Sequence, residues 1–255
     1  MNFPAEAIWE AVEPSLPGFT VEVLPQVDST NSELMRRARL GQTEPVLLVA
    51  EQQTAGRGRL GRQWRSQAGE SLTFSLGLQL VPSDWAGLSL AVGVCLAEAL
   101  HPDIRLKWPN DLWLHDRKLG GILIETAGSP AADASSAARY AVVGVGINLA
   151  PRPSAGLSTP TAALQELLPD ADAAGTLQAI AEPLVRTLQA FETFGFAPFQ
   201  ARFNARDALR DRGVTLSDGT SGTAHGASET GALLVHTANG MHAVTSSEVS
   251  VRPSE

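Results

Sequence analysis

Residues 51–69 read EQQTAGRGRLGRQWRSQAG, and this glycine- and arginine-rich stretch is the most informative segment of the chain. Four of the nine residues at 57–65 are arginines, although the whole protein carries a formal net charge of -8. Glycine lets backbone N–H groups turn toward a ligand, and arginine binds phosphate or carboxylate oxygens in pairs. Trp64 adds a flat face on which a base could stack. We interpret the stretch as an anion-binding loop; a solvated basic loop is the plain alternative.

The same stretch contains the pattern G-x-G-x-x-G, which in dinucleotide-binding folds joins a strand to a helix. A strand is expected just before it, at residues 46–50. Residues 63–69 show no apolar stripe of helical spacing, and residues 71–76 have the composition of a strand. The Gly-Lys-Ser/Thr of a Walker A loop is missing as well. We therefore predict an arginine loop that connects two strands and belongs to neither nucleotide-binding motif.

The composition is that of a globular protein with one large domain and one small one, since 44% of the 255 residues are apolar and 18% are charged. The acidic balance argues against general nucleic-acid binding. The chain has no signal sequence and no apolar run of about 18 residues, so we expect a cytoplasmic protein without a membrane segment. A single cysteine, Cys95, and five scattered histidines predict neither a disulfide nor a zinc site.

Periodicity predicts the elements around the arginine loop. Alternating residues predict a strand at 20–27, and Ser29 or Thr30 can cap the helix that follows it. Apolar residues at helical spacing predict core helices at 83–100 and 175–194. Further strands are expected in the 104–125 segment and at 140–149, on either side of a loop at 127–138.

The last 40 residues or so differ from the rest, because short apolar segments alternate with strong turn signals. The turns are Asp218-Gly219, Thr230-Gly231 and Asn239-Gly240. We predict a small all-β module from Gly213 to the C-terminus.

Lysine is rare: only Lys107 and Lys118 occur among 19 basic residues. Where arginine is the default, a retained lysine can be needed as a compact point charge. Both lysines are therefore candidates for positions where such a charge is needed.

Four motifs in combination resemble those of biotin protein ligases over about residues 20–150, and the small β module fits as well. Any one of them alone would be a weak signal. The motifs are Asp28-Ser29-Thr30-Asn31, the segment from Gln53 to Trp64, Lys107-Trp108-Pro109-Asn110-Asp111 with Lys118 to Leu123, and Gly144 to Asn148.

The resemblance implies an α+β fold with a mixed β-sheet backed by helices, as in class II aminoacyl-tRNA synthetases. It implies a catalytic biotin- and ATP-binding domain at 1–212 and an SH3-like β-barrel at 213–255. The implied reaction is ATP-dependent. Biotin and ATP, with Mg²⁺, form biotinyl-5′-AMP and pyrophosphate, and a lysine of the biotin carboxyl carrier protein of acetyl-CoA carboxylase then takes the biotinyl group.

The resemblance implies that cations surround the two acidic reactants, because neutralising the developing charge promotes their union. Arg57 and Arg59 would hold the biotin carboxylate and the α-phosphate, and Lys118 would contact the same oxygens. Asp111 would help to place Mg²⁺ or the incoming lysine, or would brace its turn; no metal ligand is assigned firmly. The arginine loop would order over the adenylate and exclude water.

The rest of the implied pocket divides into two parts. One part hydrogen-bonds the ureido ring of biotin, and in the other Trp64 lies against adenine with Asn148 as a polar reader. The implied biotin-binding residues are Ser29, Thr30, Asn31, Gln53, Gly56, Arg57, Gly58, Arg59, Lys118 and Gly121. The implied ATP-binding residues are Arg57, Arg59, Arg62, Trp64, Asn110, Lys118 and Asn148.

Alternatives remain at this point. A lipoate- or octanoate-loading ligase of the same superfamily would share the fold, and a biotin sensor without turnover would share the pocket. Some family members carry an N-terminal helix-turn-helix domain; about 20 residues precede the first expected strand, so we expect no DNA binding here. A homodimer is slightly favoured over a monomer.

Overall fold

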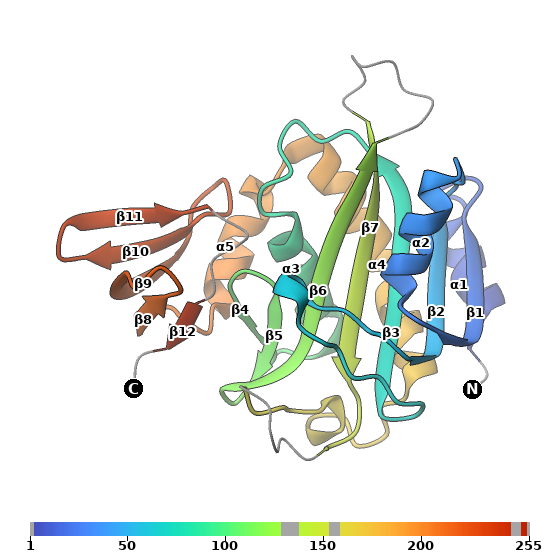
Figure 1. Ribbon diagram of the computed structural model, residues 1–255, viewed down its shortest axis with the longest axis horizontal. Coiled ribbons are helices and arrows are strands. Elements are labelled where there is room, and N and C mark those ends of the chain that lie inside the picture. Colours follow the sequence, from blue (N-terminus) through green and yellow to red (C-terminus); the bar gives the residue numbers. More distant parts are fainter. Residues whose placement is uncertain (1–2, 129–137, 153–158, 246–250, 254–255) are drawn as a thin grey trace.

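The computed structural model describes residues 3–128, 138–152, 159–245 and 251–253, and its main feature is a seven-stranded mixed sheet (Figure 1). The strand order is β1-β2-β3-β7-β6-β5-β4. Only β1 and β2 pair in parallel; the other neighbours are antiparallel. The strands are β1 (Thr20–Val27), β2 (Val46–Gln53), β3 (Ser71–Leu80), β4 (Arg105–Lys107), β5 (Asp111–Leu114), β6 (Arg117–Gly128) and β7 (Arg139–Asn148).

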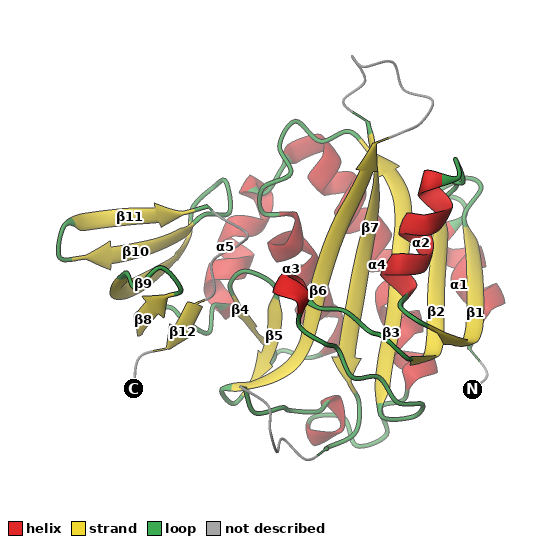
Figure 2. Cartoon of the chain, viewed as in Figure 1, coloured by secondary structure: helices red, strands yellow, loops and turns green. Residues whose placement is uncertain are grey.

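Helices cover the two faces of this sheet unequally (Figure 2). Behind the sheet, in the view of Figure 1, lie α1 (Ala5–Val12), α3 (Leu88–Leu100) and α4 (Ala173–Phe194). They bury the large apolar core against it. In front lie α2 (Thr30–Arg39), with a smaller core that includes Leu34 and Tyr140, and the short 3₁₀ helix η1 (Arg59–Gly61). The rest of the front face is thus left for the arginine loop and a cavity.

The predicted helix at 83–100 is confirmed, but it begins only at Leu88. Gly87 directly before it has φ 80°, a left-handed conformation from which a right-handed helix cannot extend backward. A Cβ on Gly87 would also lie 2.6 Å from the ring of Phe196, just before α5 (Ala197–Arg206). The Gly87 backbone therefore sets both the start of α3 and its close packing at α5.

The predicted C-terminal β module is confirmed as a five-stranded antiparallel sheet. The expected barrel is not closed in the part of the chain that the structure describes. There β11 pairs with β10 alone and the three-residue β12 pairs with β8 alone, so two sheet edges remain. The strands are β8 (Gly213–Leu216), β9 (Ser221–Ala227), β10 (Leu233–Thr237), β11 (Gly240–Val244) and β12 (Val251–Pro253).

The two sheets are tied together around the segment that leads into β5. Trp108 is 4% exposed, and its indole Nε1 donates to the carbonyl of Gly231 in the C-terminal module at 3.1 Å. Nearby, the backbone N–H of Ala208 donates to the carbonyl of Leu106 at 2.8 Å. None of the described helices combines the length and the apolar character that crossing a membrane requires. Most of the loop predicted at 127–138 lies outside the described residues.

Asp207, at the end of α5, is a buried carboxyl group at this junction. Its Oδ1 accepts from the backbone N–H of Leu209 at 2.9 Å, and its buried Oδ2 has no hydrogen-bond partner within the described ranges. Burial raises the pKa of Asp207 to about 6. Protonation is therefore easier in the folded chain than in the unfolded one, where a carboxyl group of this kind titrates near 4.

We expect the stability difference between Asp207→Asn and the parent protein to depend on pH. The raised pKa means that the parent gains stability as the pH falls through about 6 and loses it as the pH rises again. Asparagine does not titrate. The free energy of unfolding of the variant, measured relative to that of the parent, should therefore rise by about 2 kcal/mol from pH 4.5 to pH 7.5. Urea unfolding at both pH values measures this difference. An equal difference in free energy of unfolding at the two pH values would contradict a raised pKa of Asp207.

Candidate active site

A cavity of about 620 Å³ opens on the front face of the large sheet, between the start of α2, the arginine loop and strands β6 and β7. It brings together every site residue predicted from the sequence except Gly56. The predicted residues that line it are Ser29, Thr30, Asn31, Gln53, Arg57, Gly58, Arg59, Arg62, Trp64, Asn110, Asp111, Lys118, Gly121 and Asn148.

The arginine loop connects β2 to β3, as predicted, and folds into a narrow hairpin. The backbone N–H of Gly58 donates to the carbonyl of Arg62 at 2.7 Å, and that of Trp64 donates to the carbonyl of Gly56 at 2.8 Å. A Cβ on Gly56 would lie 2.4 Å from the Trp64 carbonyl oxygen, so only glycine permits this approach. Gly56 thus supports the loop from outside the cavity. The tip is the short 3₁₀ helix η1 (Arg59–Gly61).

Arg59 presents an unsatisfied cation to the cavity. Its Nη1 donates to Oδ1 of Asn110 at 3.0 Å, while its buried Nη2 has no hydrogen-bond partner in the described part of the chain. Burial lowers the pKa of Arg59, because a desolvated guanidinium loses hydration. The group stays charged at neutral pH. A bound anion would both satisfy the free donor and offset the lost hydration.

Lys118 provides a second cation, which is fixed by a carboxylate. Its Nζ donates to Oδ1 of Asp111 at 2.7 Å, across the β5–β6 pair. A Cβ on Gly121 would lie 3.2 Å from that Nζ, so the missing side chain leaves the ammonium room. Asp111 and Gly121 are register partners in the same pair. The two strands therefore hold the ammonium in one place at the cavity wall.

The opposite part of the cavity is polar and uncharged, and its side chains are bound to one another. Oε1 of Gln53 accepts from the backbone N–H and the hydroxyl of Thr30, at 2.7 and 3.2 Å. Ser75, which the sequence did not indicate, donates to Oδ1 of Asn31 at 2.6 Å. Ser29 is the N-cap of α2, so the capping interpretation is confirmed for this residue. These mutual hydrogen bonds hold the polar part in a preorganised arrangement.

Trp64 lies directly against strand β7. A Cβ on Gly146 would lie only 2.4 Å from its indole ring, so the glycine is what admits the ring. The buried Nε1 of Trp64 has no partner within the described ranges, which leaves a donor available to a ligand. Asn148, two residues along β7, donates to the carbonyls of Lys118 and Ala162, at 3.1 and 3.0 Å.

Arg152 is a cavity residue that sequence reasoning missed. Its guanidinium carbon lies 5.8 Å from the centre of the Trp64 ring, and Nη2 donates to Oδ1 of Asn148. Nη1 donates to the carbonyl of Arg65 at 3.0 Å. Burial lowers the pKa of Arg152, as it does for Arg59. Arg152 therefore adds a further half-buried cation beside the indole.

Comparison with known proteins agrees with this geometry. The chain matches the model of the biotin/lipoate A/B protein ligase family over residues 23–148 and that of the biotin protein ligase C-terminal domain over residues 212–252. It is 36% identical over 252 residues to the bifunctional ligase/repressor BirA of Escherichia coli, covering 94% of this chain and 76% of that protein. It is 34% identical over 245 residues to the biotin–[acetyl-CoA-carboxylase] ligase of Paracoccus denitrificans, covering 89% and 98%.

A solved structure extends the likeness to three dimensions. The biotin protein ligase from Aquifex aeolicus in complex with biotin and ATP is similar with a TM-score of 0.78 at 30% identity. The alignment covers 92% of this chain and 99% of that one.

Fold, cavity and family models together define an enzyme of the protein ligase class. Within that class the resemblance stated from the sequence is confirmed. The chain belongs to the biotin protein ligase family.

Proposed function

We propose that the chain attaches biotin to one lysine of the biotin carboxyl carrier protein of acetyl-CoA carboxylase, at the expense of ATP. The observation that carries this proposal is the division of the cavity. Arg57, Arg59 and Lys118 supply cations to a cavity that is also lined by the uncharged, mutually bonded side chains near Thr30 and Gln53. Such a cavity suits a ligand with a polar, uncharged head and an acidic end.

The first step joins two anions. An oxygen of the biotin carboxylate attacks the α-phosphorus of ATP, a new P–O bond forms, and the bond from that phosphorus to pyrophosphate breaks. Arg57, Arg59 and Lys118 offset the negative charge of both reactants where they meet. The free Nη2 of Arg59 and the fixed Nζ of Lys118 support this assignment. Ser29, Thr30, Asn31 and Gln53 surround the ureido ring.

In the second step the carrier lysine, as a free amine, attacks the acyl carbon of biotinyl-5′-AMP. A C–N bond forms, the bond from the acyl carbon to the AMP oxygen breaks, and the nitrogen loses a proton. Trp64 and Asn148 hold the adenine, and Arg62 and Asn110 complete the phosphate side. The division into a catalytic part at 1–212 and a carrier-assisting part at 213–255 remains a proposal, as does a homodimer.

Magnesium is assigned to the substrate. The described residues bring no group of three His, Cys, Asp or Glu side chains together, and Asp111 is ion-paired with Lys118. The described residues therefore offer Mg²⁺ no complete ligand set of their own, which is usual for an ion that substrate phosphates also bind. We propose that Mg²⁺ arrives on the phosphates of ATP.

Mass spectrometry of the acceptor tests the proposed function. The protein is incubated with MgATP, a biotin carboxyl carrier domain and either biotin or lipoate. One biotinyl group should be added to the carrier, and a carrier whose acceptor lysine is replaced by arginine should gain nothing. Equal loading with lipoate would favour the related ligase class. Tight biotin binding without any transfer would favour a sensor.

Arg152 was not indicated by the sequence motifs. We expect Arg152→Ala to raise the KM for ATP about 10-fold, which is the effect of losing one charge-assisted contact. The KM for biotin should change less than about 2-fold, because Arg152 lies beside Trp64 and Asn148 rather than near Gln53. Pyrophosphate release measures both constants. Arg186→Ala, which removes a 71% exposed arginine on α4, is the matched control. Equal KM values for ATP in the two variants would contradict a nucleotide role.

A further inference from the structure

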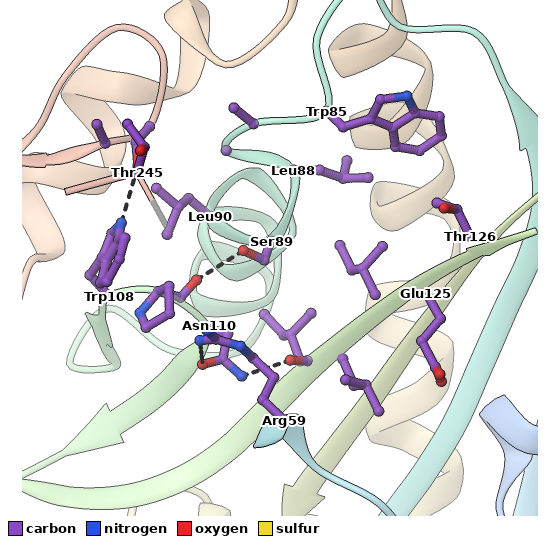
Figure 3. Close-up of a pocket in the computed structure, with 18 of the residues that line it drawn as sticks. Arg59, Trp85, Leu88, Ser89, Leu90, Trp108, Asn110, Glu125, Thr126 and Thr245 are labelled. Carbon is purple, nitrogen blue, oxygen red and sulfur yellow. Dashed lines mark hydrogen bonds between the residues drawn. The ribbon is translucent and has the colours of Figure 1, made fainter. Parts of the chain in front are cut away.

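A second cavity, of about 940 Å³, lies on the other side of the arginine loop. It is bounded by β6, the start of α3, the turn at Trp108–Asn110 and the C-terminal module. Figure 3 shows Glu125 and Thr126 at one end of this cavity and Trp108 and Thr245 at the other. Residues 57–60 of the arginine loop line both cavities and separate them.

Glu125 lines this second cavity and not the active-site cavity, yet it bonds two of the predicted site residues. Its Oε2 accepts from Nη2 of Arg57 at 2.6 Å. The same oxygen accepts from Nδ2 of Asn31 at 3.0 Å. Glu125 is thus an acidic group behind the cationic wall of the active site.

Asn31 is too firmly held to move with Glu125. Its Nδ2 also donates to the carbonyl of Leu123 at 3.1 Å, its Oδ1 accepts from Ser75, and the residue is 3% exposed. A Cβ on Gly144 would lie 2.0 Å from Oδ1, so β7 packs directly against the amide. The amide therefore fixes the Glu125 carboxylate at a defined point on β6.

Arg57, by contrast, depends on Glu125. Its side chain is 44% exposed, and within the described ranges Nε and Nη1 make no hydrogen bond. A long, half-exposed side chain with one anchor would sample many rotamers if that anchor were removed. With the anchor in place, one nitrogen is bound from behind and the remaining donors stay available to an acidic ligand.

We propose that Glu125 is a positioning residue for adenylate formation, which holds the guanidinium of Arg57 at the wall of the active-site cavity. This inference rests on the proposed function. Glu125 lines the second cavity and not the active-site cavity, and its effect on the rate passes mainly through Arg57. The same Glu125 oxygen also accepts from Asn31, so one carboxylate contacts both the start of α2 and the arginine loop.

A double-mutant cycle between Glu125 and Arg57 tests the proposal. We expect Glu125→Ala to lower the single-turnover rate of adenylate formation about 30-fold and Arg57→Ala about 100-fold, from the sizes of lost charge-assisted contacts. If Glu125 acts through Arg57, the double variant should match Arg57→Ala within about 2-fold. Independent roles would multiply the losses to about 3,000-fold, and that result would overturn the proposal.

Further variants separate positioning from general damage. Glu125→Gln keeps an acceptor oxygen without the charge, and should lose about 5-fold. Glu98→Gln removes a carboxylate of comparable exposure that pairs with Arg202 away from both cavities, and should stay within about 2-fold of the parent. If Glu125→Ala fails to fold, the cycle is run with Glu125→Gln. A parent protein that forms no adenylate in the same assay would refute the proposed function itself, whereas an active parent with multiplying losses would refute only the role of Glu125.

Discussion

Replacing Lys118 by alanine should lower the single-turnover rate of adenylate formation by about 100- to 1,000-fold. In the proposed reaction the ammonium offsets charge on both the carboxylate and the α-phosphate. Its position is fixed by Asp111 at 2.7 Å and by the space above Gly121. Water that fills the vacated space would have to reorient as charge develops, whereas the fixed ammonium does not. Rapid-quench measurement of biotinyl-5′-AMP from one enzyme equivalent gives the rate.

Arg117→Ala is the matched control, because it removes a cation from the neighbouring position of β6. Arg117 pairs with Glu166 and does not line the active-site cavity, so its loss should change the rate less than about 2-fold. Lys118→Arg keeps the charge but not the compact shape, and should recover only part of the rate. The fold should survive Lys118→Ala with a modest drop in Tm, since Asp111 keeps access to solvent. Adenylate formation at the parent rate would remove Lys118 from the reaction centre.

The second large effect is expected from Gly146→Ala, which should raise the KM for ATP roughly 10- to 100-fold, the loss typical of one base–aromatic stack. The added methyl group would lie 2.4 to 2.8 Å from three atoms of the Trp64 indole. Strand β7 cannot retreat, because Gly146 pairs with Thr73 on one side and Gly121 on the other. The indole, carried by a loop, must therefore move, and the stacking surface that we propose for adenine would be lost.

Gly128→Ala controls for the general effect of adding a methyl group to a strand, since a Cβ there would have no neighbour within 4 Å. The KM for biotin should stay within about 3-fold in both variants, because the Trp64 ring belongs to the nucleotide side of the proposed site. Steady-state pyrophosphate release at varied ATP and at varied biotin separates the two constants. Unchanged KM for ATP in Gly146→Ala would show that the nucleotide binds elsewhere.

The features that the sequence predicted well are those that short motifs encode. The arginine loop, the β-turn signals after Gly213 and the helix cap at Ser29 each depend on residues a few positions apart. Gly56 was expected in the biotin pocket, but it lies outside the cavity. It permits the close approach of its hairpin partner Trp64, and the sequence motif does not indicate this contact. The barrel was implied by the resemblance, whereas the described strands form an open sheet, because the pairing of edge strands depends on tertiary geometry that local turn signals do not specify.

The features that escaped prediction depend on the register of distant strands. Glu125 meets Asn31 across 94 positions of sequence and Arg57 across 68, and nothing in the local pattern of β6 indicates this meeting. Ser75 and Arg152 are common residue types without a motif around them. The β3–β7–β6 pairing brings Ser75 and Glu125 to the side chain of Asn31, while Arg152 follows the end of β7.

The turn that carries Trp108 and Asn110 has one further consequence. Trp108 is tethered to Gly231 in the C-terminal module, while Asn110, two residues later, accepts from Arg59. One short turn of chain therefore contacts both the terminal module and the guanidinium of Arg59, so the orientation of this cation depends on how the two sheets pack together.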